Sequence, residues 1–275
     1  ILFLLTSFFA FAQMKIVATY PPIQSLVAQI TDGVYPVNLL YTKAGPHHDV
    51  QLKPSQMKTL QNADIVFWVG EDLETYLPDT LKSIAPKALS VPLIHNEKLK
   101  LKNSVSNPKQ KDVHFWMNVD NAIATLDYIE QIMAEKDPAN KNKFAQNKQK
   151  AIRYFDTLKD SASVLSKKRK FVALHDGFDY FFDYFDLNGT TLGIEPENLQ
   201  TPQQIQDFKK QLTELNPDCI IIEPSLTRRE KSALGLDKYA LQKADAIGWN
   251  IAPGTGHLYK TMRWTISQMR RCSKK

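Results

Sequence analysis

Short apolar runs alternate with amphipathic segments along this chain, and this alternation constrains its fold more than any other feature. In the first third of the chain, strands are predicted at residues 15–19, 34–41, 65–69 and 88–91, and helices at 22–30, 54–61 and 75–84. The run at 65–69, IVFWV, is apolar at every position, which is typical of a strand buried on both faces of a parallel sheet. This rhythm predicts a layered α/β lobe.

The same rhythm returns later in the chain. Strands are predicted at 171–174, 190–194 and 219–222, and helices at 178–185, 201–215 and along an apolar stripe at 258–269. Between the two regions lie a helix at 120–134 and a helical stretch at 138–166, which would span ~43 Å at 1.5 Å per residue. We therefore predict two Rossmann-like lobes with mostly parallel sheets, joined by one long rigid helix. The predicted boundaries are 13–136 for the first lobe, 137–167 for the linking helix and 168–275 for the second lobe.

The first twelve residues, ILFLLTSFFAFA, are apolar without polar alternation. The run is shorter than a membrane span, and Ala10, Phe11 and Ala12 form a small-x-small cleavage site. A buried strand or helix is the alternative, but a signal-peptide remnant at 1–12, cleaved near Ala12, accounts better for the pattern. We expect an exported, periplasmic protein that is monomeric and does not insert stably into the membrane.

The two cysteines, Cys219 and Cys272, are too few for a disulfide-built scaffold or a four-thiolate zinc site. In an exported protein they are expected to form a disulfide that fastens the C-terminal helix to the second lobe. The chain-entropy estimate for such a bridge is ~4 kcal/mol. Two free thiols in the core are the alternative.

The net charge of +6 comes from one region of the chain. Residues 136–170 contain eleven Lys or Arg and three Asp, a local excess of +8. Apolar positions recur there at helical spacing, from Ile152 through Phe155 and Leu158 to Leu165, so the lysines are interpreted as the solvated face of a helix. Few aromatic residues and no glycine loops accompany them, and we expect no nucleic-acid partner.

Three of the six histidines lie in loops and are the first candidates for metal ligands. His48 lies in a loop after the strand at 34–41, His114 follows an irregular lysine-rich segment, and His175 follows the strand at 171–174. In open parallel sheets, binding groups gather in the crevice at the carboxyl ends of the strands. Three imidazoles in such a crevice suit Zn²⁺ and leave one position for an oxygen ligand. A single histidine at a strand end is more often a hydrogen-bonded structural residue, so the prediction depends on all three.

The remaining histidines are weaker candidates. His47 and His257 lie in loops that could approach the crevice and are second-choice ligands. His95 follows Pro92-Leu93-Ile94 in a linker and is interpreted as structural.

Four segments together resemble the metal motifs of a known family. The segments are 45–56 (GPHHDVQLKPSQ), 112–116 (DVHFW), 172–177 (VALHDG) and 245–251 (DAIGWNI). They are similar in kind and order to those of the periplasmic zinc-binding proteins of ABC importers, and Cys219 and Cys272 are placed like a cysteine pair in that family. The likeness extends over nearly all of the chain from Lys15.

The resemblance implies a Zn²⁺ site between two helix-linked lobes, in a carrier that serves a membrane permease and is not an enzyme. Matched by motif, the ligands are His48, His114 and His175, and the fourth position falls to Asp245, to His47 or to water. Three nitrogens with at most one carboxylate favour zinc over manganese. Asp112 lies beside a proposed ligand and could orient its ring, although loop capping is its simpler role.

Three alternatives stay open at this point, the third of them an adhesion protein that uses the metal only structurally. The first is a manganese or iron carrier of the same fold. The second is a secreted zinc hydrolase, which would also use three histidines and an open position, although no motif assigns a general base. The segment at 98–112 departs from many zinc-binding relatives because it is short, lysine-rich and without histidine, so no auxiliary metal-collecting role is expected for it.

Overall fold

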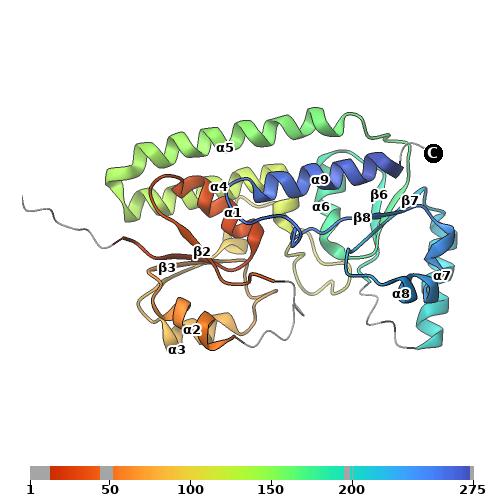
Figure 1. Ribbon diagram of the computed structural model, residues 1–275, viewed down its shortest axis with the longest axis horizontal. Coiled ribbons are helices and arrows are strands. Elements are labelled where there is room, and N and C mark those ends of the chain that lie inside the picture. The colour runs from red at the N-terminus through yellow and green to blue at the C-terminus, as the bar shows by residue number, and fades with distance from the viewer. Residues whose placement is uncertain (1–12, 44–51, 195–198, 200, 273–275) are drawn as a thin grey trace, which may run out of the picture.

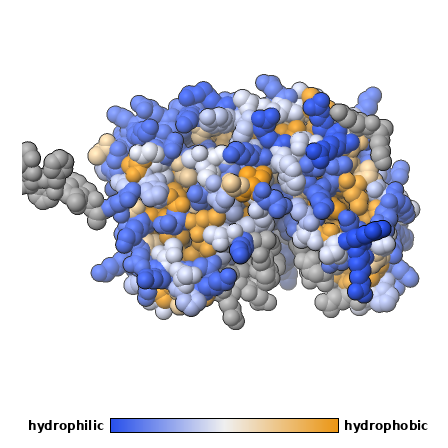
Figure 2. All heavy atoms as spheres, viewed as in Figure 1, coloured by the Kyte–Doolittle hydropathy of each residue, from blue (hydrophilic) through white to orange (hydrophobic). Residues whose placement is uncertain are grey.

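The computed structural model describes residues 13–43, 52–194, 199 and 201–272. The predicted signal peptide at 1–12 and the loop with His47 and His48 lie outside these residues. Figure 1 shows two lobes side by side beneath a layer of long helices. In Figure 2, hydrophilic residues cover much of the same face, and a hollow separates the two lobes at the lower edge of the view.

Each lobe contains a four-stranded sheet in which all strand pairs are parallel. The first sheet has the order β2-β1-β3-β4 and the second has the order β6-β5-β7-β8. The strands are β1 (Ile16–Ala18), β2 (Val37–Leu39), β3 (Ile65–Trp68), β4 (Leu89–Pro92), β5 (Phe171–Ala173), β6 (Gly189–Thr191), β7 (Cys219–Ile222) and β8 (Leu241–Lys243). In both sheets the strand order reverses between two neighbouring strands, β1 and β3 in the first sheet and β5 and β7 in the second. The crevice of such a sheet opens at the carboxyl ends of those strands.

Most helices match the predicted pattern with small shifts at their ends. The helices are α1 (Pro21–Thr31), α2 (Pro54–Gln61), α3 (Leu77–Ile84), α4 (Val119–Lys136), α5 (Lys141–Ala162), α6 (Asp179–Tyr184), α7 (Pro202–Leu215), α8 (Arg228–Ala233) and α9 (His257–Cys272). Of these, α5 is shorter than predicted and α8 was not predicted. The fold of two parallel-sheet α/β lobes is therefore confirmed, whereas the domain boundaries stay a prediction.

Helix α5 is shorter than the predicted stretch at 138–166. Pro138–Asn140 forms a separate 3₁₀ turn, in which the Asp137 side chain accepts a hydrogen bond from the backbone N–H of Asn140. The α-helix spans 22 residues, or about 33 Å at 1.5 Å per residue. It still extends along both lobes in Figure 1 and packs against α1, α4 and α9.

The buried stripe of α5 largely follows the prediction. Phe155, Leu158 and Leu165 are buried, whereas Ile152 is only half-buried. One continuous core contains residues of both sheets and of α1, α4, α5 and α9, and a second, smaller core lies on the other face of the second sheet. The two lobes therefore share apolar packing through the helix layer.

The lysine-rich face of α5 is bound to its neighbours at defined points. Lys148 forms ion pairs with Asp127 and Glu130 of α4, at 2.9 and 3.2 Å. Asn147 donates hydrogen bonds to the backbone carbonyls of Ile30 and Asp32 at the end of α1, both at 2.8 Å. These contacts make α5 part of the first lobe's packing as well as a connection.

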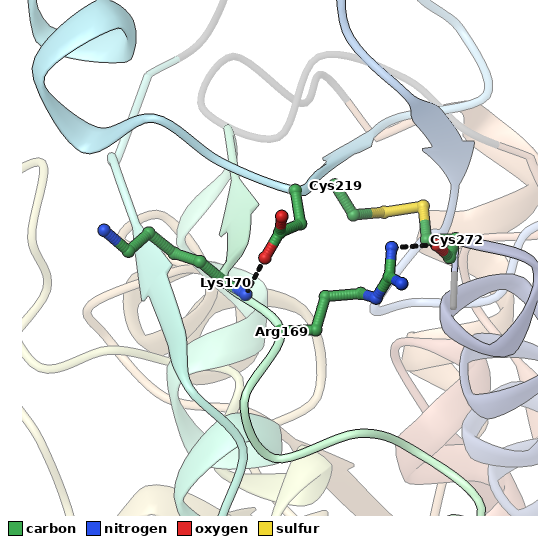
Figure 3. The surroundings of a disulfide bond; sticks show 5 residues. Arg169, Lys170, Cys219 and Cys272 are labelled. Atoms are coloured by element: carbon green, nitrogen blue, oxygen red, sulfur yellow. Dashed lines mark hydrogen bonds between the residues drawn. A yellow bond between two sulfur atoms is a disulfide. The ribbon is translucent and has the colours of Figure 1, made fainter. Parts of the chain in front are cut away.

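A disulfide joins Cys219, the first residue of β7, to Cys272, the last residue of α9 (Figure 3). The two Cα atoms are 5.8 Å apart. Arg169 donates a hydrogen bond to the Cys272 carbonyl beside the bridge. The predicted pairing of the two cysteines is thus present in the structure.

No helix among the described residues combines the length and the apolar character that a bilayer crossing requires.

Candidate metal site

Two of the three predicted ligands lie close together, with their ring Nε2 atoms near each other. His114 precedes the 3₁₀ turn Phe115–Met117, between β4 and α4 of the first lobe. His175 follows β5 of the second lobe by two residues. Their Nε2 atoms are 3.4 Å apart, and the ring planes are nearly perpendicular, at 85°. The fold therefore brings together two imidazoles that are 61 residues apart in the chain.

The spacing of these nitrogens fits one small cation between them. Zinc–nitrogen bonds of about 2.0–2.1 Å at a tetrahedral angle place two ligand nitrogens about 3.3–3.4 Å apart. The observed 3.4 Å agrees with that value. Two unprotonated nitrogens at this distance repel each other unless a cation or a proton lies between them, so the pair is suited to hold a positive charge.

Asp112 orients the His114 ring. Its Oδ1 accepts hydrogen bonds from the backbone N–H of His114 at 3.0 Å and from ring Nδ1 at 2.8 Å. Asp112 is 4 % exposed and His114 is 7 % exposed, so water competes little for this contact. With the proton on Nδ1, the lone pair of Nε2 faces His175, which is the tautomer that a metal requires. Asp112 therefore caps the loop, as expected, and also directs the proposed ligand.

Asp245 lies two residues after β8, on a loop beside the histidine pair. Both of its carboxylate oxygens accept backbone hydrogen bonds, from Ile247 at 2.8 Å and from Trp249 at 2.7 Å. The loop contacts the His114 region because Trp116 Nε1 donates to the Ala246 carbonyl at 2.9 Å. In this arrangement the carboxylate shapes its own loop, and its role as the fourth ligand stays a prediction.

Glycine at position 177 permits the close approach of this loop to His114. A Cβ at Gly177 would lie 2.6 Å from the Cβ of Ala246 and 3.3 Å from Cδ2 of the His114 ring. A larger residue would displace one of these neighbours, so this glycine helps to determine where the imidazole lies.

The positions of the remaining predicted ligands stay a prediction. His47 and His48 lie outside the described residues. Within the part of the chain that the structure describes, no group of three or more His, Cys, Asp or Glu side chains is arranged to hold one metal ion. The described site is therefore a pair, which a further ligand would have to complete.

The other two histidines have separate contacts. His257, predicted to lie in a loop, is instead the first residue of α9. It is 1 % exposed, and its Nε2 lies 2.8 Å from the Ile247 carbonyl, so the ring supports the Asp245 loop. His95 lies on the surface with its Nε2 3.0 Å from Glu71, which agrees with the structural role predicted for it.

A cavity of about 500 Å³ lies elsewhere, between α1, α5 and α9. Lys150, Lys260 and Arg263 contribute to its lining, together with Tyr154 and Tyr259. One carboxylate, Asp32, also lines it, but the three cationic side chains outnumber it, so the charge of this lining disfavours a metal ion.

Glu74 is a buried carboxyl that follows β3, beyond the carboxyl end of that strand. The side chain is fully buried, and its Oε2 accepts a hydrogen bond from the backbone N–H of Val69 at 2.7 Å. Burial raises the pKa of Glu74 to about 8, and hydrogen bonds from the backbone only partly oppose this effect. Burial of the Tyr41 hydroxyl raises the pKa of Tyr41, and the negative charge of Glu74 adds to this effect.

Glu74→Gln is expected to remove a pH-dependent loss of stability. The pKa of Glu74 is about 8 in the folded protein and near 4.5 without burial. Between these values the folded state keeps a proton that the unfolded state releases, so the wild type's free energy of unfolding falls as pH rises. The loss approaches about 1.4 kcal/mol per pH unit. Urea unfolding at pH 5 and pH 8 measures this effect. The free energy of unfolding of the variant, relative to that of the wild type, should be higher at pH 8 than at pH 5.

Exposed Glu97→Gln is the matched control and should follow the wild type at both pH values. A constant difference between Glu74→Gln and the wild type across this pH range would contradict the raised pKa.

Comparisons with known proteins bear on the sequence and the fold of this chain. The family described as "Zinc-uptake complex component A periplasmic" matches residues 16–272. The high-affinity zinc uptake system protein ZnuA of Yersinia pestis is 26% identical over 287 residues, covering 92% of this chain and 85% of that protein. The solved structure of the solute-binding protein FpvC of Pseudomonas aeruginosa with Ni²⁺ superimposes with a TM-score of 0.78 at 19% identity, covering 95% of this chain and 97% of that one. The periplasmic zinc-binding protein TroA of Treponema pallidum gives a TM-score of 0.78 at 17% identity, covering 96% of this chain and all of that one (100%).

Proposed function

This chain belongs to the family of periplasmic component A proteins of zinc-uptake complexes, and from that premise we propose that it captures Zn²⁺ in the periplasm and delivers it to the permease of an ABC importer. The observation that carries the proposal is the 3.4 Å separation of the His114 and His175 Nε2 atoms. That distance suits two nitrogens of a tetrahedral zinc shell.

The proposed ligands are His48, His114 and His175. The fourth position is open to Asp245, to His47 or to a water molecule. Neutral imidazoles are good ligands for zinc, whereas manganese prefers carboxylate, carbonyl and water oxygens. A shell with three nitrogens therefore supports zinc as the cargo.

A carrier of another divalent transition metal is the second candidate. The structure of FpvC contains Ni²⁺, so a related fold accommodates a different ion. Nickel and copper bind imidazole well, and the histidine pair alone does not discriminate against them. Selectivity then depends on the geometry that the complete shell imposes.

Metal titration of the metal-free protein tests the proposed function. We expect one Zn²⁺ per chain, and an excess of Mn²⁺ of about 100-fold should fail to displace it, because three nitrogen ligands disfavour manganese. Isothermal titration and chelator competition measure both quantities. Equal affinity for the two ions, or no zinc binding at all, would reject the proposal.

A further inference from the structure

A small hairpin leads from the first lobe to the metal site. Backbone hydrogen bonds join Asp112 to the Lys102 carbonyl at 2.9 Å and Ser104 to the Gln110 carbonyl at 3.0 Å. We refer to residues 102–112 as the hairpin. Its last residue is Asp112, whose carboxylate orients the His114 ring at 2.8 Å.

The tip of the hairpin is bound to the second lobe beside the other imidazole. Oδ2 of Asp176 accepts hydrogen bonds from the Ser104 hydroxyl at 2.6 Å, from the Ser106 hydroxyl at 2.8 Å and from the Ser106 backbone N–H at 3.2 Å. Asp176 directly follows His175 and is 7 % exposed. Hydrogen bonds to an ionised carboxylate are about twice as strong as neutral ones, so this contact holds the hairpin firmly.

The two serines provide most of the polar contacts of this carboxylate. Its other oxygen, Oδ1, is buried and has no hydrogen-bond partner among the described residues. If both hydroxyls were removed, Asp176 would keep only the Ser106 backbone N–H. A buried charge with so few partners is costly, so the carboxylate would be expected to move toward water.

A second set of contacts anchors the base of the hairpin to α6. The Tyr180 hydroxyl accepts a hydrogen bond from the Lys102 backbone N–H at 2.8 Å and donates one to the Asp112 carbonyl at 3.0 Å. Lys102 also pairs with Asp183, but that pair is partly exposed and contributes little. Both ends of the hairpin therefore contact the second lobe.

Gly193, which lies just after β6, makes room for the tip. Its φ is +61°, and a Cβ there would lie 2.6 Å from the Ser106 nitrogen and 2.8 Å from Asp176 Oδ1. Any other residue would be strained at this backbone angle and would also push the hairpin away from Asp176.

We propose that the hairpin is a latch between the lobes that sets the separation of the two imidazoles, with Ser104 and Ser106 as positioning residues. One end orients His114 through Asp112, and the tip holds the residue next to His175, so a shift of the hairpin changes both ligands together. The inference rests on the proposed zinc site. It gives the segment without histidines a role in shaping the metal shell.

The test is the double variant Ser104→Ala, Ser106→Ala. We expect zinc affinity to fall about 10-fold, the lower end of the range for groups that support ligands, and zinc dissociation to accelerate. Co²⁺ substitution gives a direct readout of geometry, because the visible absorption of cobalt is intense in four-coordinate sites and weak in six-coordinate ones. The variant's cobalt spectrum should be weaker and shifted, which loss of stability alone would not produce.

Two further variants sharpen the test. Ser104→Thr, Ser106→Thr keeps both hydroxyls and should restore the wild-type cobalt spectrum. Ser161→Ala, Ser163→Ala removes two hydroxyls from the end of α5, where they bond only local backbone carbonyls, and should behave as the wild type.

Gly193→Ala displaces the tip without removing a hydroxyl and should change the spectrum in the same direction. If the wild type binds zinc and the double alanine variant has the wild-type affinity, dissociation rate and cobalt spectrum, the latch is overturned while the proposed function stands. A wild type that binds no zinc overturns both.

Discussion

His114→Ala and His175→Ala are each expected to weaken zinc binding about 100- to 1000-fold. Four ligands share an apparent binding free energy of about 10–16 kcal/mol in structural zinc sites, or roughly 2.5–4 kcal/mol per ligand, and 1.4 kcal/mol is a tenfold change in affinity. The Nε2 atoms of these residues are 3.4 Å apart, so either substitution leaves the other imidazole without its partner. Competition with a chelator of known zinc affinity measures the loss.

The matched control is His95→Ala, which removes an exposed imidazole 3.0 Å from Glu71 and should leave zinc affinity unchanged. His48→Ala is expected to weaken binding as strongly as the other two ligand variants, because motif matching assigns it the third nitrogen. Full affinity in both His114→Ala and His175→Ala would show that zinc binds elsewhere on the chain.

The clearest elements of the fold were predictable because their signals are local. The runs IVFWV and CIII are apolar at consecutive positions, and the strands β3 (Ile65–Trp68) and β7 (Cys219–Ile222) are buried throughout. Proline at the first helical turn marks the starts of α2 and α7, where the predicted and observed bounds agree closely.

Two elements of the second lobe were missed. Strand β8 (Leu241–Lys243) is three residues long and only partly buried, so it has no apolar run to reveal it. Helix α8 (Arg228–Ala233) is six residues long and has no buried residue. Its capping box, in which Thr227 and Glu230 exchange hydrogen bonds, was a usable signal for its start.

The approach of the histidine pair was predictable, as was the contact of Asp112 with His114, but the serines that bind Asp176 were not. His175 follows a strand, and groups at strand ends meet in the crevice of a parallel sheet, so its approach to the cleft follows from topology. The contacts of Ser104 and Ser106 with Asp176 span 72 and 70 residues. No local pattern marks such long-range hydrogen bonds, and only the packing of the two lobes reveals them.

Loss of the Cys219–Cys272 disulfide is expected to lower the free energy of unfolding by ~4 kcal/mol, since the bridge closes a loop with a sequence separation of 53. Denaturant unfolding of the wild type with and without reductant measures the loss. The Cys219→Ala, Cys272→Ala double variant is the control, because reductant should not affect it.

Zinc affinity should be unchanged after reduction of this bridge, because the bridge and the proposed ligands lie at opposite ends of the strands. Cys219 pairs with Phe171 at the start of β5 and β7, whereas His175 follows the opposite, carboxyl end of β5. The disulfide thus fastens α9 at the amino ends of the strands, whereas the proposed metal ligands lie at their carboxyl ends. A loss of less than about 1 kcal/mol in the free energy of unfolding would show that the buried face of α9 holds the helix without the bridge. A large loss of zinc affinity in the folded, reduced protein would show that the two ends of the strands are coupled through α9.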